Sequence, residues 1–295
     1  MVSPAQSREA VEALRSRGRD VAHACRMVGI HRSTYRYRSH VRADEPRLRK
    51  SLGELADKYP PYGYRRPRKL LLRDGWCVNE KRVQRLRSLD HLQVPRKRSR
   101  KRIRRDQPWP ERGKARNHVW TMDFVFDRTF DGRQLKILSL LDEYTRVCLA
   151  LHVGRSLTGA DVVRVLDRAV REHGLPAFLR ADNGPEFVGM ALTEWTLDRK
   201  NEMNFIEPGR PWQNGCVESF HDKLRKECLD RECFLSLAEA RVVLESWRRE
   251  YNEFRPHSSL GDMTPAEFAV CPGGPDSATL RPPLLGSPLQ PPTVT

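Results

Sequence analysis

Basic residues are concentrated near the start of this chain, and this asymmetry limits what its two parts can fold into. Residues 1–116 contain 33 Lys and Arg against 12 Asp and Glu, whereas residues 117–295 contain 21 against 26. A segment with so large a charge excess repels itself unless a polyanion relieves the repulsion. A basic surface that only aids solubility is the weaker alternative. The sequence therefore predicts a polyanion-binding front joined to a separate working domain.

Composition excludes several classes of protein. No stretch approaches the roughly 18 apolar residues that a membrane-spanning helix needs, so we expect no membrane association. The first residues lack the apolar segment of a secretory signal. Seven cysteines are scattered without a CxxC motif, which argues against a disulfide framework or a zinc site. These features favour a cytoplasmic protein.

Two small helical units are expected in the basic front. Short helices separated by Gly18 and Gly29 predict a helix-turn-helix-like unit over residues 1–45, although any small helical hairpin would look similar. A second helical unit is predicted over residues 46–94, and its last helix has an apolar face and a basic face. The side chains expected to contact DNA from these units are Arg32, Arg36, Arg65, Arg66, Lys81, Arg82 and Arg85.

Two further segments are expected to lack a fold of their own. Residues 95–116 form a basic linker, in which the stretch PRKRSRKRIRR has eight Lys and Arg in eleven positions. We expect this linker to follow a phosphate backbone, although a plain solvated linker would look the same. Its candidate contacts are Arg96, Lys97 and Arg98. The Pro-rich residues 272–295 show no periodicity and are predicted to be disordered.

Residues 117–271 have the alternation of a folded α/β domain. Three strand-like segments come first, with an Asp-Gly hairpin turn between the first two. A helix that opens at Thr158 follows, then a fourth strand, one helix over residues 186–201 and a short fifth strand. Two more helices complete the domain, the first over residues 216–230. This order predicts a mixed five-stranded sheet with helices on both faces.

Three acidic residues stand where a carboxylate is costly unless it is paired or bound to a metal. Asp123 lies inside the apolar strand VWTMDFVF, Asp182 follows the fourth strand, and Glu218 lies near the start of the helix after the QNG loop. No basic partner lies near them in sequence, which indicates coordination of a hard cation by oxygen. Each acid also has a purely structural interpretation. Asp123 would be an edge-strand turn residue, Asp182 a turn former before Asn183, and Glu218 a solvated helix residue.

The spacing of these acids, with 58 residues between the first two and 35 between the last two, resembles that of DDE transposases and retroviral integrases. The segments VWTMDFV, LDEYTR, ADNGPEF, PGRPWQNGCVESFHDKLRKECL and YNEFRPHSSLGDMTPAEF are similar to the OrfB-type transposase of bacterial IS-three-family insertion sequences. YGYRR, NEKRVQRL and ACRMVGIHRSTYRYR resemble that family's segments before the core. The resemblance spans about residues 8–270, and the departures at Trp212 and Cys216 do not touch the acids.

The resemblance implies a ribonuclease H-like integrase catalytic core and a two-metal mechanism for DNA end cleavage and strand transfer. Asp123, Asp182 and Glu218 would be the catalytic residues and would hold two Mg²⁺ or Mn²⁺ ions. The implied partners are double-stranded DNA, at the element ends and the target, and the product of an upstream reading frame, fused by frameshifting. A homo-oligomer on DNA, associated with the bacterial nucleoid, is also implied. The alternatives are a non-catalytic DNA-binding repressor or inactive transposase relic, and a ribonuclease H-type hydrolase.

Other polar residues near the three acids have expected roles. Asp142 and Glu143 fit a strand-end turn, and Glu186 fits a helix-start charge that the helix dipole favours. Scaffolding of loops is nearly as plausible as DNA contact for most of the remaining candidates. The residues expected to contact DNA near the acids are Asn183, Gln213, Asn214 and Arg225.

Overall fold

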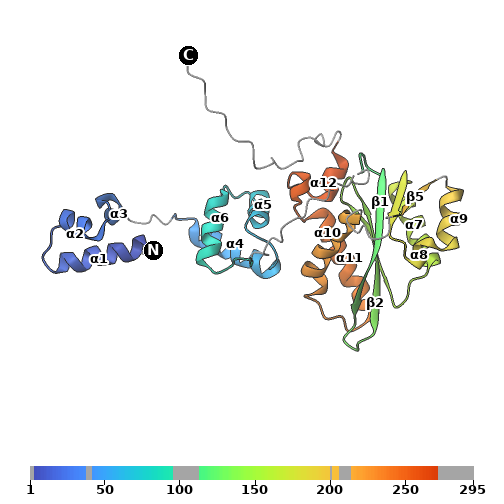
Figure 1. The fold of residues 1–295 in the computed structure, drawn as a ribbon, viewed down its shortest axis with the longest axis horizontal. Coiled ribbons are helices and arrows are strands. Elements are labelled where there is room, and N and C mark those ends of the chain that lie inside the picture. Colours follow the sequence, from blue (N-terminus) through green and yellow to red (C-terminus); the bar gives the residue numbers. More distant parts are fainter. Residues whose placement is uncertain (1–2, 38–41, 96–112, 200, 206–213, 272–295) are drawn as a thin grey trace, which may run out of the picture. The chain divides into compact units, whose positions relative to one another are not determined.

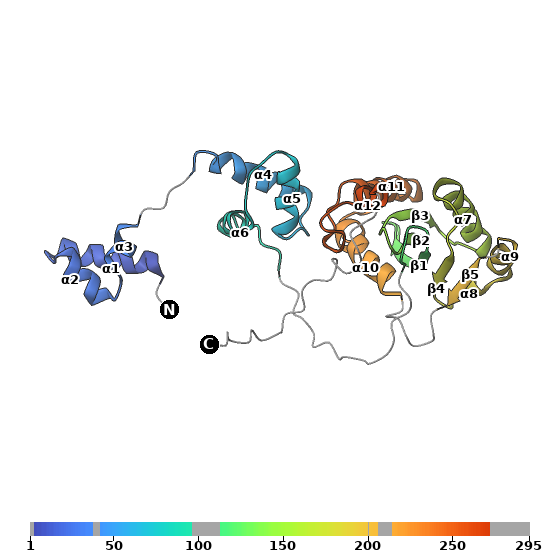
Figure 2. The same cartoon turned by 90° about the horizontal axis from the view of Figure 1, so that it is seen from above.

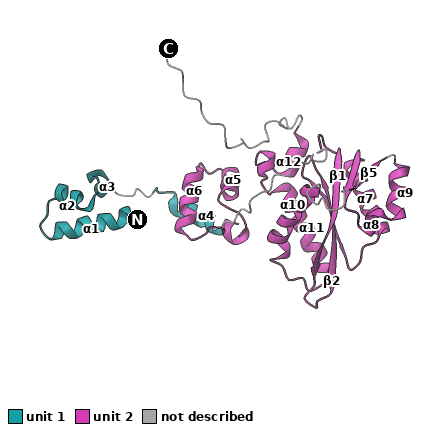
Figure 3. Cartoon of the chain, viewed as in Figure 1, with its two compact units in different colours: residues 1–54 teal, residues 55–295 magenta. Residues whose placement is uncertain are grey.

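The computed structural model describes residues 3–37, 42–95, 113–199, 201–205 and 214–271 (Figure 1). The chain divides into two compact units, residues 1–54 and residues 55–295 (Figure 3). This division falls inside helix α4 (Glu45–Lys58), whereas the sequence placed a domain boundary between residues 45 and 46. The helix α4 is continuous, so the predicted boundary lies at its first residue and the boundary between the two compact units lies within it. Most of the predicted basic linker and all of the Pro-rich tail lie outside the described residues.

The first unit contains three short helices that pack around a small apolar core. They are α1 (Pro4–Ser16), α2 (Val21–Val28) and α3 (Arg32–Arg36). The Asp20 side chain accepts a hydrogen bond from the Ala22 backbone N–H and so caps α2. Gly29 ends α2 in the left-handed conformation, with φ of 73°, where a side chain would be strained. The buried core consists of Val11, Ala24 and Cys25. The predicted helix-turn-helix-like arrangement is confirmed.

The second unit begins with the rest of α4 and two further helices, α5 (Arg65–Arg73) and α6 (Glu80–Leu89). Pro67 lies in the first turn of α5, where its missing N–H costs nothing. Asn79 caps α6 by accepting a hydrogen bond of 2.8 Å from the backbone N–H of Arg82.

A mixed five-stranded sheet forms the centre of the second unit. Its strands are β1 (Val119–Arg128), β2 (Gln134–Asp142), β3 (Cys148–Gly154), β4 (Phe178–Ala181) and β5 (Glu202–Phe205). The order across the sheet is β3-β2-β1-β4-β5. The first three strands pair antiparallel, whereas β4 pairs parallel with both β1 and β5. This topology matches the predicted mixed sheet.

Helices cover both faces of the sheet (Figure 2). One face packs against α7 (Gly159–His173), α8 (Pro185–Val188) and α9 (Met190–Asp198). The other packs against α10 (Gly215–Leu224), the π-helical segment η2 (Arg225–Leu229) and α11 (Leu237–Glu253). A 3-10 turn, η3 (Ser258–Leu260), and helix α12 (Pro265–Val270) follow. Each face has its own buried apolar cluster, so the sheet is the middle of three layers.

Two helices differ from their predicted form. The single helix expected over residues 186–201 is two helices, because Gly189 between them has an extended backbone (φ −65°, ψ 155°). The helix expected over residues 216–230 changes from α10 to π-helical geometry at Arg225. No helix in the described part of the chain is both long and apolar enough to cross a membrane.

Candidate active site

The three predicted carboxylates come from three different elements of the second unit. Asp123 lies within β1, Asp182 directly follows β4, and Glu218 lies in the first turn of α10. Thr121 is the partner of Arg180 in the parallel β1–β4 pairing. The same register, continued by two residues, brings Asp182 level with Asp123.

The alternation of β1 directs Asp123 toward α10. Trp120 and Met122 belong to the apolar cluster on the α7 face, whereas Val125 belongs to the cluster on the α10 face. Since successive side chains of a strand point to opposite faces, Asp123 shares the α10 face with Thr121 and Val125. The carboxylate of Asp123 and the helix that carries Glu218 therefore lie on the same side of the sheet.

Two polar contacts attach α10 to the central strands. The Thr121 hydroxyl donates to the side-chain oxygen of Asn214, just before the helix begins. One turn beyond Glu218, Nε2 of His221 lies 2.5 Å from the hydroxyl oxygen of Ser139 on β2. Between these contacts the helix buries an apolar face in the core, made of Val217, Phe220 and Leu224. Glu218 is left on the exposed side of the helix.

Asp123 has a strongly perturbed acidity. Burial, with smaller contributions from the negative charges of Asp182 and Glu218, raises the pKa of its carboxyl group from 3.8 to about 6. A hydrogen bond of 2.7 Å from the Phe124 backbone N–H to Asp123 Oδ1 opposes the rise. Burial also raises the pKa of Glu218. The three acids are thus near enough to repel one another electrostatically.

The donor set suits a divalent metal ion. All three groups are carboxylates, which are preferred ligands of hard cations, and a cation would relieve their mutual repulsion. Within the described residues, however, no three His, Cys, Asp or Glu side chains are already arranged to hold a metal ion. The acids therefore fit a metal chemically, but their side chains must draw together when an ion binds.

His221 is a further residue of this site that the sequence analysis did not select. Its Nδ1 lies 3.7 Å from Oδ2 of Asp123, and its side chain is 14% exposed. Burial, reinforced by the positive charge of Arg225, lowers the pKa of the His221 ring to about 4. Its position three residues after Glu218 on one helix was the available signal, because such residues are neighbours on a helix surface.

The acids expected to be structural are confirmed in that role. Asp142 is 1% exposed, and its carboxylate accepts hydrogen bonds from the backbone N–H groups of Asn117, Tyr144 and Thr145. Glu143 forms a buried ion pair with Arg180. In the first turn of α8, Glu186 pairs with Lys136, whose ammonium group also lies 4.1 Å from the centre of the Phe124 ring.

The candidate DNA contacts fall into separate groups. Those with exposed side chains are Arg32, Arg36, Arg65, Lys81, Arg85, Asn183 and Arg225, and Arg82 is half-buried. Asn214 is 4% exposed and its side-chain oxygen accepts a hydrogen bond from Thr121, which gives it a structural role, and its contact with DNA stays a prediction. The candidates that lie outside the described residues are Arg96, Lys97, Arg98 and Gln213.

Arg66 also takes part in an ion-pair network with residues of the sheet domain, and its contact with DNA stays a prediction. Its guanidinium group lies 3.4 Å from Glu227 of η2. Glu227 also accepts two hydrogen bonds of 2.7 Å from Arg255, a residue only 2% exposed. The sequence could not show this network because its members are far apart along the chain.

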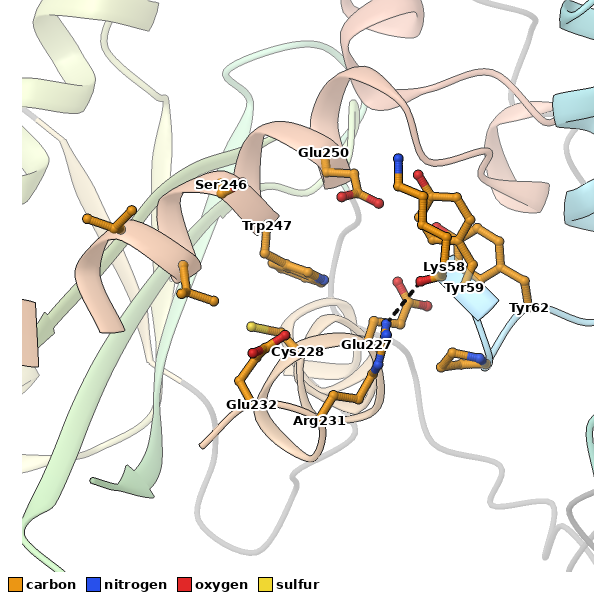
Figure 4. Close-up of a pocket in the computed structure, with 13 residues that line it drawn as sticks. Lys58, Tyr59, Tyr62, Glu227, Cys228, Arg231, Glu232, Ser246, Trp247 and Glu250 are labelled. Atoms are coloured by element: carbon orange, nitrogen blue, oxygen red, sulfur yellow. Dashed lines mark hydrogen bonds between the residues drawn. The ribbon is translucent and has the colours of Figure 1, made fainter. Parts of the chain in front are cut away.

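A pocket of about 400 Å³ lies beside this network (Figure 4). Lys58, Tyr59 and Tyr62 line one part of it, and side chains of η2 and α11 line the rest. Arg231 closes one end by donating to the backbone oxygen of Lys58 at 3.3 Å. None of the three candidate carboxylates lines the pocket, so it is distinct from the site around Asp123.

Known families match most of the described chain. An Integrase core domain matches residues 113–211, a second Integrase core domain family matches residues 199–265, and an HTH-like domain matches residues 44–105. A structure of the simian T-cell lymphotropic virus intasome, in complex with PP2A regulatory subunit B56 gamma, aligns with a TM-score of 0.50. That alignment covers 83% of this chain and 80% of the other at 14% identity, and it shows a shared fold. Fold and families define an integrase-core protein of the ribonuclease H-like class with a helix-turn-helix-like region.

Several similar sequences are proteins of insertion elements. A 39.2 kDa protein of element IS476 from Xanthomonas euvesicatoria is 41% identical over 252 residues, which cover 84% of this chain and 71% of that protein. A 31.7 kDa protein of element IS407 from Burkholderia multivorans is 39% identical over 247 residues, covering 84% and 89%. Transposase InsF of IS3A from Escherichia coli is 26% identical over 156 residues, covering 52% and 54%. The chain belongs to the OrfB-type transposases of the IS-three family of insertion sequences.

Proposed function

We propose that this transposase cleaves DNA at the ends of its element and joins those ends to new DNA, using Asp123, Asp182 and Glu218 as metal ligands. The observation that carries the proposal is electrostatic. Three separate elements bring the acids so near that Asp182 and Glu218 raise the pKa of Asp123. Burial and like charges both disfavour the ionised form of Asp123, and a bound cation would offset both effects.

Each of the three acids would have its own role in holding the metal ions. Asp123, whose pKa both other acids raise, would bridge two ions, with Asp182 holding one and Glu218 the other. Bound divalent ions supply activation of the attacking oxygen and stabilisation of the leaving oxygen of a phosphodiester. Asn214 and Ser139 would keep α10, and with it Glu218, docked on the strand that carries Asp123.

DNA is the expected macromolecular substrate. The HTH-like and integrase core domains both imply DNA binding, and exposed Arg36, Arg65 and Lys81 can neutralise phosphates. We propose that double-stranded element ends and target DNA are both bound. We further propose a homo-oligomer on DNA, a frameshift fusion with the upstream-frame product, and a cytoplasmic, nucleoid-associated location.

The decisive experiment incubates the full chain, alone and fused to its upstream frame, with element-end DNA and Mg²⁺. We expect nicking and strand transfer by at least the fusion, and loss of both with Asp123→Asn, Asp182→Asn or Glu218→Gln. DNA binding should survive each change, because each removes a charged ligand while nearly conserving volume. Binding without cleavage by the wild-type proteins would instead identify a repressor or an inactive relic. Cleavage restricted to RNA–DNA hybrids would identify a ribonuclease H-type hydrolase.

A further inference from the structure

His221 is held between two strand residues at the candidate metal site. Ser139 lies opposite Asp123 in the β1–β2 pairing. Its hydroxyl oxygen is 3.0 Å from the backbone oxygen of Asp123 and 2.5 Å from Nε2 of His221. The other ring nitrogen, Nδ1, lies 3.7 Å from the Asp123 carboxylate. One hydroxyl group therefore ties the imidazole to the strand that carries the acid.

The donors and acceptors in these contacts favour one ring tautomer. A backbone carbonyl oxygen only accepts hydrogen bonds, so the single hydroxyl proton of Ser139 is donated to Asp123. The Ser139 oxygen must then accept from His221, which places the ring proton on Nε2. A ring with one proton consequently presents the bare lone pair of Nδ1 to the Asp123 carboxylate.

Two acceptors that face each other attract only if a positive charge or a proton lies between them. A neutral imidazole with its second nitrogen hydrogen-bonded is also the form in which histidine binds metal ions, since the outer contact fixes its tautomer and orientation. In this chain the outer contact is Ser139, and the adjacent carboxylate is Asp123. The arrangement is that of two neighbouring ligands of one cation.

We infer that His221 supplies a nitrogen ligand to the divalent ion at Asp123, in addition to the three carboxylates. The inference rests on the proposed metal-dependent function. Charged groups near the ring are Asp123 on β1 and Arg225 in η2, and Glu218 lies one turn earlier on α10. His221 lies at the edge of the buried face of α10, against Ser139 of the sheet, and Glu218 lies one turn earlier on the exposed side of the same helix.

The test uses Mn²⁺ bound to the full chain as a paramagnetic probe. We expect pulsed electron paramagnetic resonance to show coupling of bound Mn²⁺ to an imidazole nitrogen, and ¹⁵N-histidine labelling to change the coupling frequency. In His221→Phe, which keeps a ring without a lone pair, the coupling should vanish and Mn²⁺ affinity should fall by about tenfold. His221→Asn provides a second variant without an imidazole, in case the larger ring disturbs folding.

Two controls make the result specific. Ser139→Ala removes the outer contact but leaves Nδ1, so nitrogen coupling should persist. Asp123→Asn should lose most of the Mn²⁺ binding. The inference would be overturned if Mn²⁺ binding to the wild-type protein is lost in Asp123→Asn but shows no nitrogen coupling. It would also be overturned if the coupling survives both His221 variants. Either result would leave the carboxylate metal site unaffected. Mn²⁺ binding that is absent, or unaffected by Asp123→Asn, would overturn both the inference and the metal assignment.

Discussion

Neutralising Asp123 should make the metal-free protein more stable at neutral pH, although it abolishes activity. The pKa of this carboxyl group is raised from 3.8 to about 6 in the folded protein, a difference equivalent to about 3 kcal/mol. Its side chain is 25% exposed, so solvent screening reduces this figure only modestly. Asn at this position retains an oxygen that can accept the hydrogen bond from the Phe124 backbone. We expect Asp123→Asn to gain up to about 3 kcal/mol in free energy of unfolding above pH 7.

The pH dependence of that gain follows from the direction of the shift. Below pH 3.8 the carboxyl group is protonated in both folded and unfolded chains, so the variant gains nothing. Between that pH and about 6 the unfolded chain releases its proton first, and the wild type loses stability relative to the variant. Above about pH 6 the difference is complete. Asp198→Asn, which makes the same charge change at the exposed end of α9, should show no such profile.

The assay is urea unfolding of the metal-free proteins at several pH values, followed by the fluorescence of the buried tryptophans of the core. Mg²⁺ should stabilise the wild type, since a ligand that binds only the folded state shifts unfolding by mass action, and Asp123→Asn should lose most of that stabilisation. A variant that is less stable than the wild type at pH 8, with or without metal, would refute the argument that burial and like charges strain Asp123.

Three other changes test the remaining architecture. Glu227→Gln should lower the free energy of unfolding by about 3–5 kcal/mol because it leaves a buried arginine without its partner, and exposed Glu232→Gln should be nearly neutral in the same urea titration. Asn214→Ala should cost about 1–3 kcal/mol by leaving a buried hydroxyl unsatisfied; a normal melting temperature would contradict its anchoring role. Arg65→Ala should reduce the salt slope of DNA binding by about 0.9 per lost phosphate contact, whereas Arg66→Ala should leave that slope unchanged and lower stability instead.

Local signals in the sequence were sufficient for most of the fold. Asp20, Gly29 and Asn79 define helix ends by capping and by backbone conformation, and these effects depend only on near neighbours. The mixed sheet was also predictable, because three alternating strands followed by helix–strand pairs indicate antiparallel strands joined to parallel ones. The break at Gly189 and the π-helical segment after α10 were missed, since both depend on how the helices meet the sheet.

The acids of the candidate site could be predicted from local sequence, but the contacts of the residues around them could not. The acids were selected because a charge inside an apolar strand, or at a strand end, is conspicuous in the sequence itself. The hydrogen bond between Asn214 and Thr121 was not predictable, because a polar residue in a loop looks the same in sequence whether it faces DNA or a buried hydroxyl. The ion pair of Arg66 was not predictable for a similar reason, as its partner Glu227 is distant in sequence. Both contacts depend on the tertiary structure.

The packing of α10 connects the stability of the core to the chemistry proposed for the site. Val217 and Phe220 are buried against the sheet, and helical geometry places His221 at the edge of that buried face and Glu218 on the exposed side beside it. Any change that rotates α10 must move both polar side chains together, because they share one turn. A smaller side chain at position 220 should therefore reduce metal affinity, although Phe220 is not itself a ligand. Helix α10 therefore contributes to the apolar core and also positions Glu218 and His221 relative to Asp123.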